Sequence, residues 1–273
     1  MQAKSIKGNS PEAIIAALQH SMADGYRPTL AIVFLTNMAD IDAVTGILDT
    51  AGITVFGAST SEKFNETDID PDGIIVLLMD MNPAYFNIIL QNFESPADAY
   101  EAAGKVGQAG KNSFDHPAFI ISTADLRIAG NDIIRGILDK AGTEVPVIGG
   151  MAGEPVNFNG IVFTNNAATP SGLLALIIDE NKVTVKGVAV SGWKPVGTEK
   201  KITKSDGNWV YTIDDEPAIE VIKKFLGKEM VVNVKSIGID SYPLQVQRGQ
   251  GKPMMRPIVF WKEEDQSIML GAP

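Results

Sequence analysis

Apolar and polar residues follow one another along the chain in stretches whose length and spacing predict strands and helices in turn. The run Pro28-Thr-Leu-Ala-Ile-Val-Phe-Leu35 is continuously apolar and bounded by turn residues, which is typical of a strand buried on both faces. Ser10-Pro11 and Ser95-Pro96 each combine a capping residue with a first-turn proline, which predicts a helix start. Strands are predicted at residues 28–35, 53–56, 74–79 and 85–90, and helices from 10 to about 25, from about 40 to 50, and from 95.

After Gly110 the same order of elements begins again. Gly46-Ile-Leu-Asp-Thr-Ala-Gly52 returns as Gly136-Ile-Leu-Asp-Lys-Ala-Gly142. The second set comprises apolar strands at 117–122 and 173–178, with an inserted strand near 161–164. Shared composition of βαβ units could produce one such match by chance, but an ordered series favours an internal duplication. We therefore expect residues of about 28–80 and 117–179 to superpose as two copies of one unit.

Beyond Lys182 the pattern changes to alternating, strand-rich sequence. The elements predicted there are strands at 183–190 and 209–213, a helix from 216 to 225 before Gly227, and a hairpin over 258–270. Strands 74–79 and 85–90 are separated by too few residues for a crossover helix, so mixed sheets are expected. The predicted fold is α/β (mixed α+β): layered mixed β-sheets with flanking helices, built from two pseudo-repeats, plus a smaller strand-rich C-terminal region. The expected domains are 1–190 and 191–273.

Composition narrows the classes of function. The 273 residues include 23 Lys and Arg against 33 Asp and Glu, a formal charge of −10, so a phosphate backbone would be repelled and nucleic acid is not an expected partner. Cysteine is absent, which excludes disulfides, zinc–thiolate sites and thiol nucleophiles. No apolar run approaches the roughly 18 to 20 residues that cross a bilayer, and the start lacks a signal-peptide pattern. We expect a cytoplasmic protein with no membrane partner.

Several motifs match part of a known metal-binding, phosphate-binding or catalytic motif but lack its remaining residues. Asp68-Ile-Asp70-Pro-Asp72-Gly73 begins like a calcium loop, but Met79 stands where the bidentate glutamate belongs, so an acidic turn is favoured. Gly149 to Gly153 and Gly249 to Lys252 lack the spacing of phosphate-binding loops. No Gly-x-Ser-x-Gly elbow is present. His20 and His116 are too few for a histidine metal cluster, and solvated surface positions are favoured for both. No cofactor is expected.

Polar segments that follow apolar strands are the remaining candidates for a binding site. Open α/β sheets bind small ligands at such strand ends, because a rigid scaffold fixes the backbone N–H groups and hydroxyls there. The alternative is that these segments are tight turns with solubilising side chains. The candidate ligand-binding residues are Gly57, Ser59, Thr60, Ser61 and Glu62 after one strand, Asp125 and Arg127 after another, and Gly149, Gly150 and Glu154 after a third.

A longer ordered series resembles a known family. Gly192-Trp193-Lys-Pro195-Val-Gly197, Gly207-Asn208-Trp-Val-Tyr211 and Pro217-Ala218 resemble the junction between the two halves of the FIST domain, a sensory domain of intracellular signal transduction. The glycine-rich segments at Gly57 and Gly149 resemble the N-terminal half of that family. The resemblance implies an N-terminal half followed by a short C-terminal part.

Two positions depart from the family pattern, since Ala58 and Ser61 stand where cysteine and glycine are expected. The resemblance implies a small-ligand sensor, with amino acids as the ligand class and a separate signalling protein as the partner, and it implies no enzyme. Three alternatives remain open: a metal-free enzyme that uses Asp125 or Glu154, a haem-based gas sensor that uses His20 or His116, and an assembly module without a ligand.

The small-ligand sensor hypothesis leads to two structural predictions. The segments at Gly57 and Gly149 should converge on one pocket, where a zwitterionic amino acid would place its carboxylate on backbone N–H groups or Arg127 and its ammonium on Asp125 or Glu154. Trp193 is expected to be buried as an anchor beside the turn that Gly192 and Pro195 form.

Overall fold

A computed structural model describes most of the chain and divides it into two compact units. The units are Met1–Gly187 and Val188–Pro273. The described residues are 1–66, 69–70, 72–125, 128–153, 160–188, 192–227, 242–247, 249 and 253–271.

The first unit is built on two mixed β-sheets. In spatial order, the first sheet contains β1 (Ala3–Gly8), β6 (Ile74–Met79), β2 (Leu30–Leu35), β3 (Thr54–Ser59), β10 (Val162–Phe163) and β11 (Ala168–Thr169). The second sheet contains β7 (Phe86–Asn92), β12 (Gly172–Asp179), β8 (Pro117–Thr123) and β9 (Val147–Met151). The β2–β3 and β8–β9 pairs are parallel and the other pairs are antiparallel, which confirms the mixed sheets. A separate short pair joins β4 (Lys63–Phe64) to β5 (Ile69–Asp70).

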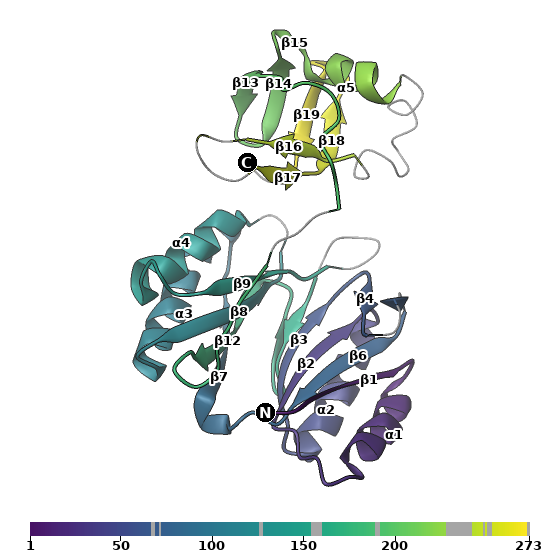
Figure 1. Ribbon diagram of the computed structural model, residues 1–273, viewed down its shortest axis with the longest axis vertical. Helices are drawn as coiled ribbons and strands as arrows, with labels where there is room; N and C mark the ends of the chain where they lie inside the picture. The colour runs from purple at the N-terminus through teal and green to yellow at the C-terminus, as the bar shows by residue number, and fades with distance from the viewer. Residues whose placement is uncertain are drawn as a thin grey trace. The chain divides into compact units, whose positions relative to one another are not determined.

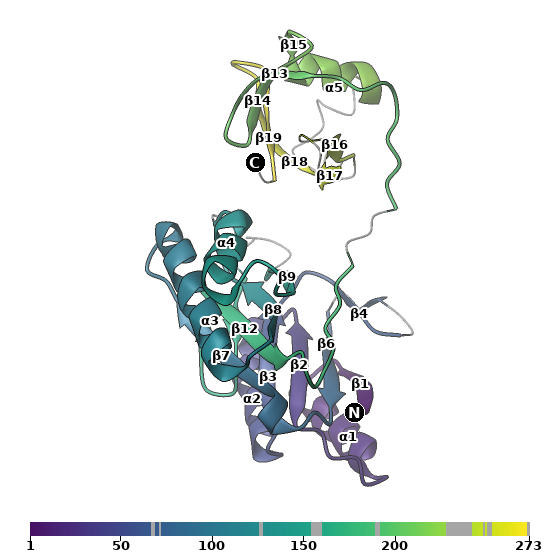
Figure 2. The same cartoon turned by 60° about the vertical axis from the view of Figure 1, so that its left-hand side comes forward.

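Helices cover the outer faces of both sheets. The helices of the first unit are α1 (Pro11–Met22), α2 (Ile41–Thr50), α3 (Ala99–Ser113) and α4 (Gly130–Ala141), with short 3-10 turns η1 (Met38–Asp40), η2 (Pro83–Tyr85) and η3 (Pro96–Asp98). The pair α1 and α2 lies against the first sheet, and α3 and α4 lie against the second (Figures 1 and 2). The unit is therefore a four-layer α/β/β/α arrangement.

Strand β2 shows why the central strands are apolar throughout. Its side chains alternate between the two sides of the sheet: Val33 and Leu35 join the core beneath α1 and α2, whereas Leu30 and Ile32 join the core between the sheets. The same alternation in β8 sends Phe119 toward α3 and α4 and Ala118 toward the other sheet. Burial on both faces explains the unbroken apolar runs. We call the apolar core between the two sheets the inter-sheet layer.

The two sheets follow the same topology. The chain order β1-α1-β2-α2-β3, completed by β6, is repeated as β7-α3-β8-α4-β9, completed by β12. In both sheets the last strand pairs antiparallel with the first two strands, and the second and third are parallel. The inserted strand β10 crosses to the first sheet and pairs with β3. Superposition of the two halves as copies of a duplicated unit stays a prediction.

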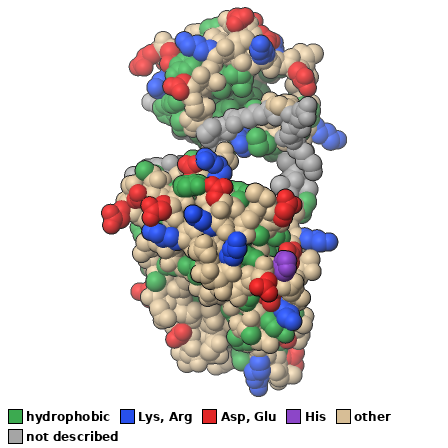
Figure 3. Space-filling view, turned by 90° about the vertical axis from the view of Figure 1, so that its left-hand side faces the viewer, with side chains coloured by type: hydrophobic (Ala, Val, Ile, Leu, Met, Phe, Trp, Pro, Cys, Tyr) green, Lys and Arg blue, Asp and Glu red, His purple; other side chains and the backbone are tan. Residues whose placement is uncertain are grey.

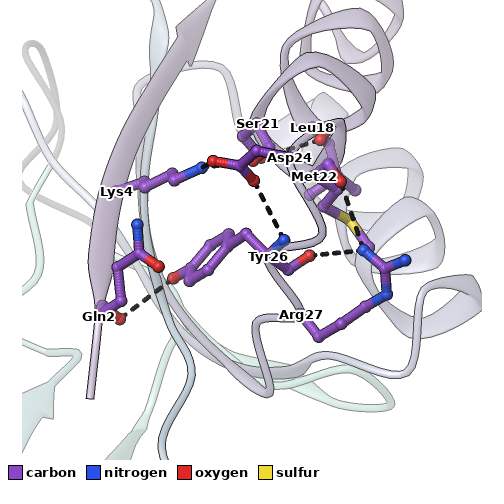
Figure 4. Close-up of polar contacts among 8 residues, drawn as sticks. All are labelled: Gln2, Lys4, Leu18, Ser21, Met22, Asp24, Tyr26 and Arg27. Atoms are coloured by element: carbon purple, nitrogen blue, oxygen red, sulfur yellow. Dashed lines mark hydrogen bonds and ion pairs between the residues drawn. The ribbon is translucent and has the colours of Figure 1, made fainter.

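Strand β1, which the sequence pattern did not predict, is fastened to α1 by a polar cluster (Figure 4). Lys4 donates hydrogen bonds to the Ser21 carbonyl and to Asp24 Oδ2, both at 2.7 Å, and its ammonium lies 4.7 Å from the centre of the Tyr26 ring. The bond from Lys4, followed by one from the Tyr26 N–H, holds the pKa of Asp24 below its usual range. Burial, followed by the charge of Asp80, raises the pKa of Tyr26 to about 12.

In the described part of the second unit, an antiparallel third sheet is packed against the helix α5 (Ala218–Leu226). The other described elements are β13 (Ile202–Asp206), β14 (Trp209–Ile213), β19 (Ser267–Leu270), β18 (Ile258–Lys262), β15 (Glu216–Pro217), and the pair β16 (Leu244–Val246) and β17 (Met254–Arg256). Ile219 and Ile222 of α5 pack on Val210 and Ile268 of the sheet. The hairpin expected over 258–270 is confirmed as β18–β19. None of the described helices is long and apolar enough to span a bilayer.

Two expectations from the sequence are wrong. Residues 183–188 form no strand, and 189–190 lie outside the described residues. The alternation that suggested a strand arises because Val183 and Val185 pack against the inter-sheet layer from an irregular segment. Trp193 is 52% exposed rather than buried, since it lies in an irregular stretch and not at the edge of a sheet.

Candidate functional site

The glycines of the candidate site lie in strands, not in the loops that the sequence suggested. Gly57 belongs to β3, and a Cβ there would lie 2.0 Å from the Phe163 ring. Gly149 and Gly150 belong to β9, and a Cβ on Gly149 would lie 1.9 Å from the Ile121 carbonyl oxygen. Gly57 therefore leaves room for the Phe163 ring of β10, and Gly149 permits the close approach of β8 and β9. The segments that follow these strands begin later, at Thr60 and at Ala152.

The segments that follow β3 and β9 meet in the structure. The Gly153 N–H donates to the Ser59 carbonyl at 3.0 Å, and the Ser59 hydroxyl donates to the Gly153 carbonyl at 2.9 Å. The neighbouring Ala152 N–H donates to the Thr123 carbonyl, at the end of β8, at 2.9 Å. Residues Ala152 and Gly153 therefore link the carboxyl end of the parallel pair in one sheet to that in the other.

Ser59 is a structural element of this link. Its hydroxyl accepts a hydrogen bond from the Ile161 N–H at 2.8 Å while it donates to Gly153, and the residue is 1% exposed. Thr60 is also engaged, because its hydroxyl donates to the Glu62 carbonyl. Ser61 and Glu62 are exposed. Among the candidate residues 59–62, Ser61 and Glu62 are therefore the ones that face solvent.

Lys63 is a buried cation that the sequence analysis did not select. It is 4% exposed, and its ammonium donates to the Thr36 hydroxyl at the end of β2. The Thr36 hydroxyl in turn donates to the Thr60 carbonyl at 3.2 Å. Lys63 thus ties the segment after β3 to the end of β2. In the sequence it follows a polar loop, where an exposed lysine is the ordinary expectation.

Asp125 lies at the corresponding end of the second sheet. It is 8% exposed and has a φ of 77°, in the left-handed region that asparagine and aspartate tolerate better than most residues. Its carbonyl accepts a hydrogen bond from the Ile128 N–H at 3.2 Å, which closes the turn. Arg127 and Glu154 lie outside the described residues. Within the described part of the chain, Lys63 and Asp125 are the buried charged side chains.

The inter-sheet layer is open to solvent at this end of the strands. Phe34 of β2 is on the inter-sheet face, two residues beyond Ile32, and is 37% exposed. Gly150 of β9 is exposed, and a Cβ there would meet none of the described atoms within 4 Å. Phe34 therefore leaves an exposed apolar side chain at the end of β2, two residues before Thr36, which accepts the hydrogen bond from Lys63.

Metal-binding clusters are not found in this site or elsewhere among the described residues. His20 and His116 are both exposed. Asp68 and Pro71 of the calcium-like segment lie outside the described residues. On the face shown in Figure 3, acidic and basic side chains are interspersed and form no single basic patch.

Comparison with known families decides the classification. Residues 29–216 match the family model of the FIST N domain, which is more than half of the chain. The chain belongs to the FIST family. FIST domains are sensory domains of signal transduction. A search of curated proteins finds no match. The FIST match includes every candidate site residue and extends into β14 and β15 of the second unit.

Proposed function

We propose that this FIST domain binds an amino acid or a closely related metabolite at the carboxyl ends of β2, β3, β8 and β9. Ligand binding changes its interaction with a separate signalling protein. It works as a binding module, without turnover, haem or metal. The cytoplasmic location expected from the sequence stays a prediction.

The observation that carries this proposal is the convergence of the two parallel pairs. Hydrogen bonds through Ala152 and Gly153 join the ends of β3 and β8, so polar groups from both sheets gather where open α/β sheets bind ligands. The buried charges have opposite signs and follow strands of different sheets, Lys63 after β3 and Asp125 after β8. A zwitterionic ligand requires one partner of each sign.

The same link supplies a route for the signal. A ligand that contacts residues 152 and 153 acts on segments hydrogen-bonded to both sheets at once. Binding energy that differs between two arrangements of these segments would shift the equilibrium between them.

A thermal-shift screen of the full chain tests the proposal. The probes are the twenty standard L-amino acids, with their decarboxylated amines and 2-oxo acids as partners that lack one charge. Saturation at 100 times the dissociation constant should raise the free energy of unfolding by about 2.7 kcal/mol. The amino acid should be recovered chemically unchanged after incubation, which shows that it is not turned over. The purified protein should show no Soret absorption, which shows that it holds no haem. A screen in which no compound raises the melting temperature would contradict the proposal.

Charge-removing variants then test the location. Asp125→Asn should weaken binding of the active amino acid by about 2 to 5 kcal/mol if the contact is buried, because the ligand ammonium loses its partner. Lys105→Met on α3 is the matched control, since among the described residues Lys105 pairs with exposed Glu101 in an i,i+4 arrangement, and its removal should leave the affinity unchanged. Equal affinity of Asp125→Asn and wild type for the amino acid would show that Asp125 does not contact the ligand.

A further inference from the structure

We infer that Ser122 and Gly150 form a subsite for an amino acid with an apolar side chain, an inference that rests on the proposed function. The two residues are direct partners in the parallel β8–β9 ladder. Neither has a role that the fold itself explains.

Ser122 presents an unused hydroxyl. Ala118 and Ile120 of β8 face the inter-sheet layer, so alternation places the Ser122 side chain on the same face. The residue is 6% exposed, and its hydroxyl has no hydrogen-bond partner among the described residues. Within those residues no fully buried side-chain polar atom lacks a partner, so the hydroxyl borders open space. It can accept a hydrogen bond from an ammonium or donate one to a carboxylate.

Gly150 leaves that space empty. Ile148 and Ala152 face the inter-sheet layer, so position 150 does as well. A Cβ at Gly149 would collide with a strand carbonyl, whereas a Cβ at Gly150 would meet no atom of the described residues within 4 Å, and Gly150 has no positive φ. Strand packing therefore explains Gly149 but not Gly150. A glycine that packing does not require often marks close approach of a ligand.

The residues around Ser122 and Gly150 indicate which class of ligand side chain fits there. Ala58 and the exposed ring of Phe34 are paired in the first sheet and face the inter-sheet layer, and Ile148 lies in the same core. An aliphatic or aromatic ligand side chain would bury apolar surface here. A charged side chain would lose hydration without gaining a partner on this wall. The subsite therefore takes apolar amino acids, with Ser122 on the polar head group.

The experiment measures the dissociation constants of L-leucine, L-phenylalanine, L-glutamate and L-lysine for full-length variants by calorimetry. Wild type should bind leucine or phenylalanine and bind glutamate and lysine at least tenfold more weakly. Gly150→Val fills the space, so it should weaken binding of the apolar amino acid at least thirtyfold at an unchanged melting temperature. Ser122→Ala should weaken it about five- to tenfold. Gly46→Ala is the control, since a Cβ at Gly46 of α2 also meets open space but lies away from the site.

The outcomes separate the subsite from the proposed function. Unchanged affinity in Gly150→Val and Ser122→Ala, or a preference for glutamate or lysine, would overturn the subsite and leave the sensor intact. Absence of binding by every amino acid would overturn both. If Gly150→Val has a lower melting temperature than wild type, the affinities of Gly150→Ala and Ser122→Ala are used instead. The melting temperatures of these two variants show whether they are folded.

Discussion

At the scale of single residues, two adjacent glycines in β9 have different reasons to be glycine. Gly149→Ala would place a Cβ against the Ile121 carbonyl oxygen, a backbone atom that cannot move aside. We expect a loss of about 1 to 3 kcal/mol in the free energy of unfolding, as for other overpacked positions. Gly150→Ala should cost nothing. Urea denaturation of both variants measures the difference, and equal stability of the two would show that β8 and β9 are not as close as described.

Ser59 gives a second test at this scale. Ser59→Ala removes a hydroxyl that donates to Gly153 and accepts from Ile161, which leaves both backbone groups without that partner. The expected cost is about 1 to 3 kcal/mol in the free energy of unfolding, typical of buried groups left unsatisfied. Chemical denaturation checks it. A change below about 0.5 kcal/mol, the range of ordinary surface substitutions, would contradict the role of Ser59 as a structural link.

The sequence identified some of these residues but not their roles. It selected Gly57, Gly149 and Ser59 because they follow apolar strands, yet all three serve packing or hydrogen bonding between strands. Lys63 and Ser122 were missed because a lysine after a loop or a serine at a strand end has the same local pattern whether exposed or buried. Their burial depends on segments distant in sequence, which local periodicity does not report.

At the scale of elements, the two Gly-Ile-Leu-Asp segments occupy different environments. A Cβ at Gly136 of α4 would lie 2.3 Å from the Tyr100 carbonyl oxygen of α3, whereas one at Gly46 of α2 would meet nothing within 4 Å. Gly46→Ala should raise the free energy of unfolding by about 0.5 to 1 kcal/mol through helix propensity alone. Gly136→Ala should lower it, because α3 and α4 must separate. Thermal melts of the two variants give the comparison, and a shared sign would refute the close approach of α3 and α4.

The attachment of β1 to α1 predicts a dependence on alkaline pH. The pKa of Tyr26 is about 12 in the fold and near 10 when unfolded, so its contribution is complete below about pH 10 and is lost as pH rises toward about 12. Tyr26→Phe should therefore be less stable than wild type at pH 8, since it loses the hydrogen bond to the Gln2 carbonyl, and should lose less stability above pH 10. Urea midpoints at pH 8, 10 and 11 measure this. Parallel curves for the two proteins would contradict the burial of Tyr26.

Element prediction succeeded where burial on two faces produces a strong pattern, and failed at edges. The runs that became β2, β6, β8 and β12 are apolar because helices cover one side of each and the other sheet covers the second. Strand β1 was missed because it is an edge strand in which Lys4 and Lys7 interrupt the apolar pattern. The strand expected at 183–190 was wrong because alternating valines also occur in an irregular segment that packs on a core.

At the scale of the whole chain, the mixed character of the sheets was predictable but their partners were not. The short connection between 74–79 and 85–90 suggested mixed sheets, but these strands became β6 and β7 and lie in different sheets. The antiparallel partners of β6 are β1 and β2, and those of β12 are β7 and β8, all distant in sequence. The crossing of β10 to the first sheet likewise joins residues about a hundred positions apart. That crossing and the hydrogen bonds of Ala152 and Gly153 connect the carboxyl ends of β3 and β8, which belong to different sheets. The duplication expected from the repeated segments agrees with the shared strand order and is tested directly by superposing the two halves in an experimental structure.

Hydrogen exchange of the full chain, with and without the amino acid that gives the largest melting shift, tests the central claim most directly. A ligand at the carboxyl ends of the two parallel pairs should slow exchange in peptides that span residues 57–63, 120–125 and 147–153. Peptides of α1 and β1, where Lys4, His20 and Asp24 border a shallow hollow of about 640 Å³, should be unaffected. Protection confined to that hollow or to the third sheet, with none at the strand ends, would contradict the account.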